Sequence, residues 1–143
     1  MAYYFPLILI VIANLCYHVT QKNTSDKINP FFSLFVTYFV AALVSIIILI
    51  FYKHKNTFIE NIKELNWSTF LLGVAIVLLE LGFLLAYRLG WNISTTQIIS
   101  TVIVTIILAP IGKFFFKESI SFINIIGIGV SIVGVILMNY AKK

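Results

Sequence analysis

Five apolar runs divide the sequence, and each is long enough to cross a bilayer as a helix. A transmembrane helix needs about 20 consecutive, predominantly apolar residues, because the hydrocarbon core is about 30 Å thick. Since lipid offers the backbone no hydrogen-bond partners, a helix is the favoured way for such a run to satisfy its own N–H and C=O groups. We predict an all-α polytopic membrane protein, a bundle of five transmembrane helices forming a single domain over residues 1–143. The expected spans are 3–20, 31–52, 67–89, 93–115 and 122–140.

The composition agrees with a membrane-embedded chain. It is 61% hydrophobic and only 10% charged, whereas a soluble domain is about 45–50% apolar and about 25% charged. The net charge of +5 does not indicate nucleic-acid binding, because the lysines lie at the ends of the apolar runs, where they face anionic lipid headgroups. We expect the lipid bilayer, and no nucleic acid, as a partner. The single cysteine, Cys16, excludes an intramolecular disulfide.

The longest polar segment, residues 53–66, also carries a helical pattern. Its apolar residues Phe58, Ile59, Ile62 and Leu65 recur at the spacing of one helix face. This pattern predicts a short amphipathic helix lying on the membrane surface.

The distribution of Lys and Arg does not select one orientation. Cytoplasmic loops usually carry the excess of these residues, but the two sides of this chain carry five each. Two interpretations stay open: the count from a short chain is weak and the first segments decide, or the chain inserts both ways and pairs with an inverted copy of itself. The residues counted are Lys53, Lys55, Lys63, Lys113 and Lys117 on one side, and Lys22, Lys27, Arg88, Lys142 and Lys143 on the other.

Glu80 lies almost at the middle of the third apolar run. Placing a charged side chain there costs roughly 3 kcal/mol or more, so an acid at this depth is a candidate functional residue. One interpretation is a protonated Glu80 hydrogen-bonded to a neighbouring helix; the other is a carboxyl group that exchanges a proton or meets a cation. Helical periodicity places it on one stripe with Gly73, Val77, Leu84, Tyr87 and Trp91.

Other polar residues could share a cavity with Glu80. Arg88 is about 12 Å farther along the same helix, so it either extends to the membrane surface or binds an anionic group. In the fourth run, Gln97 and Thr101 follow one face; Thr and Ser can bond back to their own helix, but a glutamine amide cannot satisfy itself that way. In the first run, Asn14 is deeper and is the better cavity candidate, whereas His18 is more consistent with a headgroup contact.

The fifth run has a different character. Gly127 and Gly134 are seven residues apart and so lie on one face. Small residues allow helix backbones to approach closely, which indicates a dimer or helix-packing surface.

No pattern indicates an enzyme, and we expect none. The sequence has no metalloprotease or nucleophile-elbow motif, no paired carboxylates on one helix, and no phosphate-binding glycine loop. One Cys and two distant His residues do not form a metal site, and we expect no cofactor.

The segment from Gly90 to the C-terminus resembles the second part of an EamA-type domain of the drug/metabolite transporter superfamily. The matching features are a tight turn at Gly90, a Thr/Ser-rich helix with Pro110 near its end, and the glycine-rich stretch 127–135. The link Lys117-Glu118-Ser119-Ile120-Ser121 is similar to the family's Gly-Glu-x-hydrophobic-Ser element, with Lys117 in place of the glycine. Asn29-Pro30 and Ala41-Ala42 extend the resemblance toward the N-terminus.

The resemblance implies a function and an assembly. Family members usually join two inverted five-helix units, so one unit implies that two chains make a transporter, a homodimer that is antiparallel. The related small multidrug resistance proteins use a first-helix glutamate, which this sequence lacks: Asn14 stands in the first run and the acid is in the third.

The sequence thus predicts a transporter of small organic molecules in the cell (plasma or inner) membrane, working by alternating access, with Glu80 as a candidate proton-coupling acid. Cationic or neutral substrates are favoured over anions. The alternative is a non-transporting subunit that stabilises another membrane protein.

Overall fold

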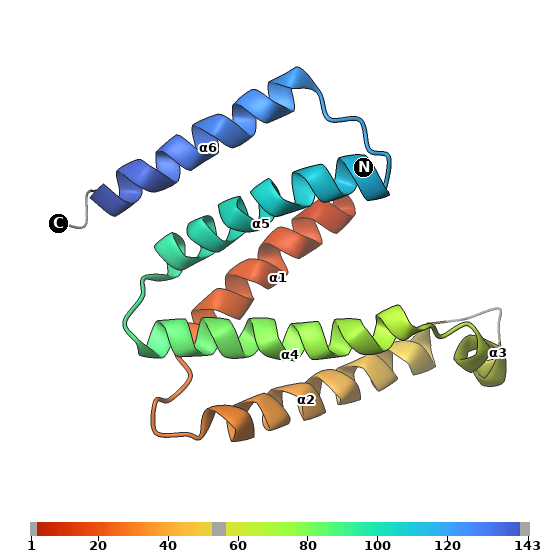
Figure 1. The fold of residues 1–143 in the computed structure, drawn as a ribbon. Helices are drawn as coiled ribbons and strands as arrows, with labels where there is room; N and C mark the ends of the chain where they lie inside the picture. The colour runs from red at the N-terminus through yellow and green to blue at the C-terminus, as the bar shows by residue number, and fades with distance from the viewer. Residues whose placement is uncertain (1–2, 53–56, 141–143) are drawn as a thin grey trace. The chain divides into compact units, whose positions relative to one another are not determined.

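Helices account for all the regular structure in the described part of the chain. The computed structural model describes residues 3–52 and 57–140, without the side chain of Asn139. Four helices have the length and hydropathy to cross a membrane, and a fifth, shorter apolar helix covers Phe122–Met138. The predicted fold class, an all-α polytopic membrane protein, is confirmed. The helices are α1 (Phe5–Lys22), α2 (Pro30–Phe51), α3 (Phe58–Lys63), α4 (Trp67–Arg88), α5 (Ile93–Phe115) and α6 (Phe122–Tyr140) (Figure 1).

Asparagine side chains fix where two of the long helices begin. Asn29 Oδ1 accepts hydrogen bonds from the backbone N–H groups of Phe31 (2.9 Å) and Phe32 (3.4 Å) at the start of α2. Asn66 Oδ1 accepts one from Ser68 N–H (3.0 Å) at the start of α4. The first N–H groups of a helix have no partner within it, so these bonds stabilise both starts.

The end of α1 differs from the prediction. The expected span ended at residue 20 and placed Gln21 and Lys22 in a polar loop, but the helix continues to Lys22. Nothing before Asn23 interrupts a helix, and the N–H of Asn23 still bonds to the carbonyls of Val19 and Thr20. This extra half-turn brings Gln21 onto the buried side of α1.

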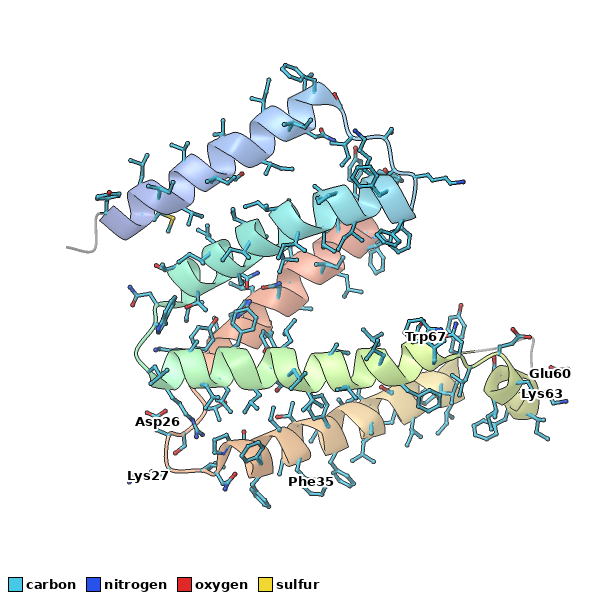
Figure 2. All side chains as sticks on the ribbon, viewed as in Figure 1. Asp26, Lys27, Phe35, Glu60, Lys63 and Trp67 are labelled. Atoms are coloured by element: carbon cyan, nitrogen blue, oxygen red, sulfur yellow. The ribbon has the colours of Figure 1, made fainter. Side chains whose placement is uncertain are left out.

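The chain divides into two units, Met1–Leu89 and Gly90–Lys143. In unit 1, α4 contacts both α1 and α2; in unit 2, α5 contacts α6 and runs antiparallel to it (Figure 1). The buried hydrophobic side chains among the described residues are Leu34, Leu84 and Tyr87, all in unit 1. Most other large apolar side chains are exposed, as lipid-facing residues are, and Phe35 points away from α4 (Figure 2).

The link between α5 and α6 is held against the end of α5. Both Phe116 and Glu118 donate their backbone N–H to the carbonyl of Gly112 (3.1 and 3.0 Å). Between them Lys117 has a φ of 55°, a left-handed conformation that favours glycine. Gly112 is buried, and a Cβ on it would collide with the carboxylate of Glu118.

The segment predicted to lie on the membrane surface contains α3. The helix covers Phe58–Lys63, and residues 53–56 of the predicted segment lie outside the described residues. Its apolar residues Phe58, Ile59 and Ile62 are exposed, and Glu60 and Lys63 lie on the same short helix (Figure 2). Contact of α3 with the membrane surface stays a prediction.

Candidate functional site

The site is built around Glu80, on the face of α4 that unit 1 covers. Glu80, Leu84 and Tyr87 are the buried residues of α4. Their spacing of four and then three residues places them on one helix face. Glu80 is only 6% exposed. A carboxyl group this deeply buried needs polar neighbours, because an unpaired charge is strongly disfavoured in an apolar surrounding.

Three side chains from the end of α1 bond to α4. Gln21 Nε2 donates to the backbone carbonyl of Glu80 (3.0 Å). The hydroxyl of Tyr87 and Nδ1 of His18 share a hydrogen bond of 2.7 Å. Lys22 Nζ donates to the carbonyl of Tyr87 (3.0 Å) and lies 5.6 Å from the centre of its ring. These contacts tie the C-terminal part of α1 to the C-terminal half of α4.

Aromatic rings fill the space between these bonds. The His18 ring stands edge-on to Tyr17 and Phe83, with ring centroids 4.9 and 4.7 Å apart. Tyr17 also packs edge-on against Phe83 at 6.0 Å. Edge-to-face packing is a favourable arrangement for aromatic rings, so it holds His18 in one position beside Tyr87.

Two further hydroxyl groups face the carboxyl of Glu80. The hydroxyls of Tyr17 on α1 and Tyr38 on α2 are buried and have no hydrogen-bond partner among the described residues. Glu80 is close enough to interact electrostatically with both. A carboxyl group near two hydroxyls can hold a proton or receive a cation.

Arg88 is directed to the link between α1 and α2. Its Nη2 donates to the carbonyls of Ser25 (3.0 Å) and Ile28 (2.8 Å), and its Nε lies 3.8 Å from the carboxylate of Asp26. Asp26 and Lys27 mark this link in Figure 2. Arg88 therefore holds the link in place and forms no ion pair with Glu80.

We name the residues around Glu80 the α1–α4 cluster. Its members differ in part from the residues that the sequence predicted to share a cavity with Glu80. Glu80 and Tyr87 belong to it, whereas Asn14 is exposed on α1. Between Asn14 and His18, the two residues that the sequence analysis compared, it is His18 that bonds to α4, although the sequence favoured it as a headgroup contact. Gln21 was missed because it was placed in a loop; its spacing from Tyr17 and His18, four and three residues, is the signal that finds it. The members are Tyr17, His18, Gln21, Lys22, Tyr38, Glu80, Phe83 and Tyr87.

The remaining predicted site residues belong to unit 2. Trp91 lies just before α5, after Gly90, whose φ of 88° makes the tight turn. Gln97 Nε2 donates to Thr101 Oγ1 at 3.4 Å, and Thr105 bonds to the carbonyl of Thr101 at 2.8 Å. The polar face of α5 is thus bonded largely to its own helix, the alternative that the sequence left open.

An open groove of about 550 Å³ lies between α5 and α6. Thr101, Thr105, Glu118 and Gly127 are among the residues that line it. A Cβ on Gly127 or Gly134 would meet nothing within 4 Å in this chain. The role of both glycines in helix or dimer packing stays a prediction.

No group of three or more His, Cys, Asp or Glu residues within the described ranges could hold a metal ion.

Comparison with known proteins gives one match. The model of the EamA-like transporter family matches residues 3–140. The chain belongs to the EamA-like transporter family. No curated protein and no solved structure matches it. As an EamA-like chain with four membrane-length helices, it is a multi-pass membrane protein of a transporter family, and the family indicates transport of small molecules.

Proposed function

We propose that this chain transports small organic molecules by alternating access and that Glu80 is its proton-coupling acid. The observation that carries the proposal is the placement of Glu80, buried near the middle of α4 with the Tyr17 and Tyr38 hydroxyls beside it. A carboxyl group so placed can bind either a proton or a positively charged substrate. Competition between the two couples transport to a proton gradient.

The other charged groups of the cluster support a cationic or neutral substrate. Lys22 and Arg88 both donate to backbone carbonyls, of Tyr87 and of the α1–α2 link respectively. Their bonds direct both cations to the ends of helices. An anionic substrate beside Glu80 would be repelled by the ionised carboxylate, which is electrostatically unfavourable.

We propose further that two copies assemble in opposite orientations in the cell membrane. The equal division of Lys and Arg between the two sides supports insertion in both orientations. Inverted repeats place substrate sites near the bilayer midplane, at the interface between the repeats. An inverted pair would give each side of the membrane an equivalent route to a central site. Reporter fusions at both termini test this, because in a chain of fixed orientation each terminus gives a signal from one side of the membrane only.

Substitution of Glu80 by Gln in purified protein in liposomes tests the coupling role. The probes are an organic cation such as tetraphenylphosphonium, a neutral amphiphile and an organic anion of similar size. We expect the wild type to accumulate the cation or the neutral compound under a pH gradient. Glu80→Gln, which cannot exchange a proton, should lose this accumulation by roughly 100-fold.

Glu64→Gln is the matched control, because it makes the same chemical change at an exposed position just after α3. It should accumulate the probes like the wild type. Accumulation that is unchanged in Glu80→Gln contradicts the coupling role, and accumulation of the anion alone contradicts the substrate class.

A further inference from the structure

The polar groups around Glu80 lead in only one direction along α4. From Phe70 to Leu79, α4 has no polar side chain, an apolar length of about 15 Å. From Glu80 toward Arg88, by contrast, the helix meets Tyr17, His18 and then Lys22 of α1. A proton moves between hydrogen-bonding groups, so the side chains of α1 and α4 offer Glu80 a route to one end of α4 and none to the other.

We propose that His18, acting through Tyr87, exchanges the proton of Glu80 with water at the C-terminal ends of α1 and α4. This inference rests on the proposed function and names the group that delivers the coupling proton. His18 precedes Lys22, the last residue of α1, by about 6 Å along the helix. Imidazole is the side chain best suited to take up and release protons near neutral pH.

The connection from His18 to Glu80 runs through two tyrosines. Tyr87 already bonds to Nδ1 of His18 at 2.7 Å, and both residues are buried. Tyr17 packs against His18 and Phe83, with ring centroids 4.9 and 6.0 Å apart, and lies within electrostatic range of Tyr87 and Glu80. Because its hydroxyl has no hydrogen-bond partner among the described residues, it can bond to Tyr87 and to Glu80 in turn.

Each transfer conserves protons. One proton arrives on a ring nitrogen of His18, and Nδ1 passes one to the oxygen of Tyr87. The hydroxyl proton of Tyr87 moves to the oxygen of Tyr17, whose own proton moves to the carboxylate of Glu80. His18 and both tyrosines end with as many protons as they began with, and the carboxylate has become a carboxylic acid; the imidazole changes tautomer and the tyrosine hydroxyls rotate before the next transfer. The reverse sequence releases the proton.

The charged or titratable groups on or beside this route come from three helices. On α1, Tyr17 and Lys22 adjoin His18; α2 contributes Tyr38; and α4 contributes Glu80 and Tyr87, with Arg88 one residue beyond.

The rate at which Glu80 takes up a proton tests the inference without any transport substrate. After a rapid drop in pH, time-resolved infrared spectroscopy of the protein in liposomes follows the carboxylic acid C=O band that Glu80→Gln lacks. We expect His18→Gln, which keeps a hydrogen bond to Tyr87 but carries no exchangeable imidazole proton, to slow this rate by roughly 100-fold. Tyr87→Phe should slow it as well, whereas Tyr4→Phe, at an exposed position before α1, should not.

Rescue separates proton delivery from a structural role. In His18→Ala, imidazole added to the buffer should restore the rate, because a small molecule in the vacated space can carry the proton. A wild-type rate in His18→Gln overturns the inference. If Glu80→Gln abolishes coupled accumulation while His18→Gln protonates normally, the proposed function stands and this inference alone fails. If Glu80→Gln transports like the wild type, the proposed function fails first.

Discussion

Side-chain hydrogen bonds join helices in unit 1, while hydroxyls of both units bond back to their own helix, as Ser45 does to Ala41 in unit 1. In unit 1, side chains of α1 bond to α4 across 59 to 69 residues of sequence, as Gln21 does to Glu80 and His18 to Tyr87. In unit 2, the hydroxyls of α5 and α6 bond to carbonyls of their own helix, as Thr105 does to Thr101 and Ser131 to Gly127. The first arrangement joins two helices, whereas in the second each hydroxyl finds its hydrogen-bond acceptor on its own helix.

This difference distinguishes polar residues that link helices from polar residues that are satisfied within one helix and can face lipid. A hydroxyl can always return to the carbonyl three or four residues earlier, so a Thr/Ser-rich helix needs no partner. A buried carboxyl or imidazole has no such local solution and needs groups from another helix, whereas the amide of Gln97 bonds to Thr101 of its own helix. The bonds between helices, rather than the number of polar residues, therefore favour unit 1 for the proposed site.

The largest effect should come from the packing beneath these bonds. Leu84 lies between Glu80 and Tyr87 and is 1% exposed, so Leu84→Ala should lower the free energy of unfolding by about 2–5 kcal/mol. Leu108→Ala is the control in unit 2, where the side chain is 54% exposed and should have little effect. Reversible unfolding in mixed detergent–lipid micelles measures both. Equal losses of unfolding free energy in Leu84→Ala and Leu108→Ala would contradict the contrast between the units.

Removing one hydroxyl from each kind of bond tests the comparison directly. Tyr87→Phe loses the bond to His18 and should lower the free energy of unfolding by about 0.6–1.7 kcal/mol, the range for side-chain bonds between membrane helices. Thr105→Val loses only a bond within α5 and should change it by less than about 0.5 kcal/mol. The same unfolding measurement compares the two variants. A larger loss in Thr105→Val would reverse the interpretation.

The links of the two units should respond differently as well. Arg88 holds the α1–α2 link by side-chain bonds, whereas the α5–α6 link contains Lys117 at a φ of 55°. Lys117→Gly should raise the free energy of unfolding by about 1 kcal/mol, because glycine adopts this conformation without strain. Lys113→Gly, inside α5, should lower it by a similar amount. Destabilisation by Lys117→Gly would show that the lysine side chain matters more than its backbone.

The smallest effect on stability is expected at α3, outside the predicted membrane spans. The backbone N–H of Thr57, which donates to Glu60 Oε2 at 2.7 Å, and then the Thr57 hydroxyl hold the pKa of the Glu60 carboxyl below its ordinary value. A lowered pKa in the folded state stabilises α3 above the pKa of the unfolded state, and this stabilisation is lost as the pH falls through the folded value. Amide NMR of Thr57 against pH follows this loss. In Glu60→Gln the same amide should show no such titration.

Most of the fold could be predicted because apolar length determines it. Long runs without charge have one main solution in lipid, and Pro30 and Gly90 mark helix boundaries by their backbone requirements. The end of α1 was the exception. Gln21 and Lys22 are polar yet compatible with a helix, so polarity alone suggested a loop, while their tertiary bonds to α4 keep them helical.

The site could be predicted only in part. Glu80 is recognisable because an acid inside an apolar run is costly to bury and therefore marks a candidate functional position. His18 and Gln21 are near a helix end, where headgroups or water satisfy polar groups equally well, and only the packing of α1 on α4 decides otherwise. Asn14 looked the better candidate because depth was the only available criterion, and depth does not say which face of α1 meets α4.

The exposed thiol of Cys16 has a practical consequence. It is the only cysteine of the chain and lies two residues before His18, about 200° round α1. A nitroxide attached there points away from the α1–α4 cluster, and no residue needs to be replaced to install it. Dipolar coupling between two such labels appears only when a second copy is within range. The natural sequence therefore suffices to count the copies in an assembly and to follow the distance between their first helices during transport.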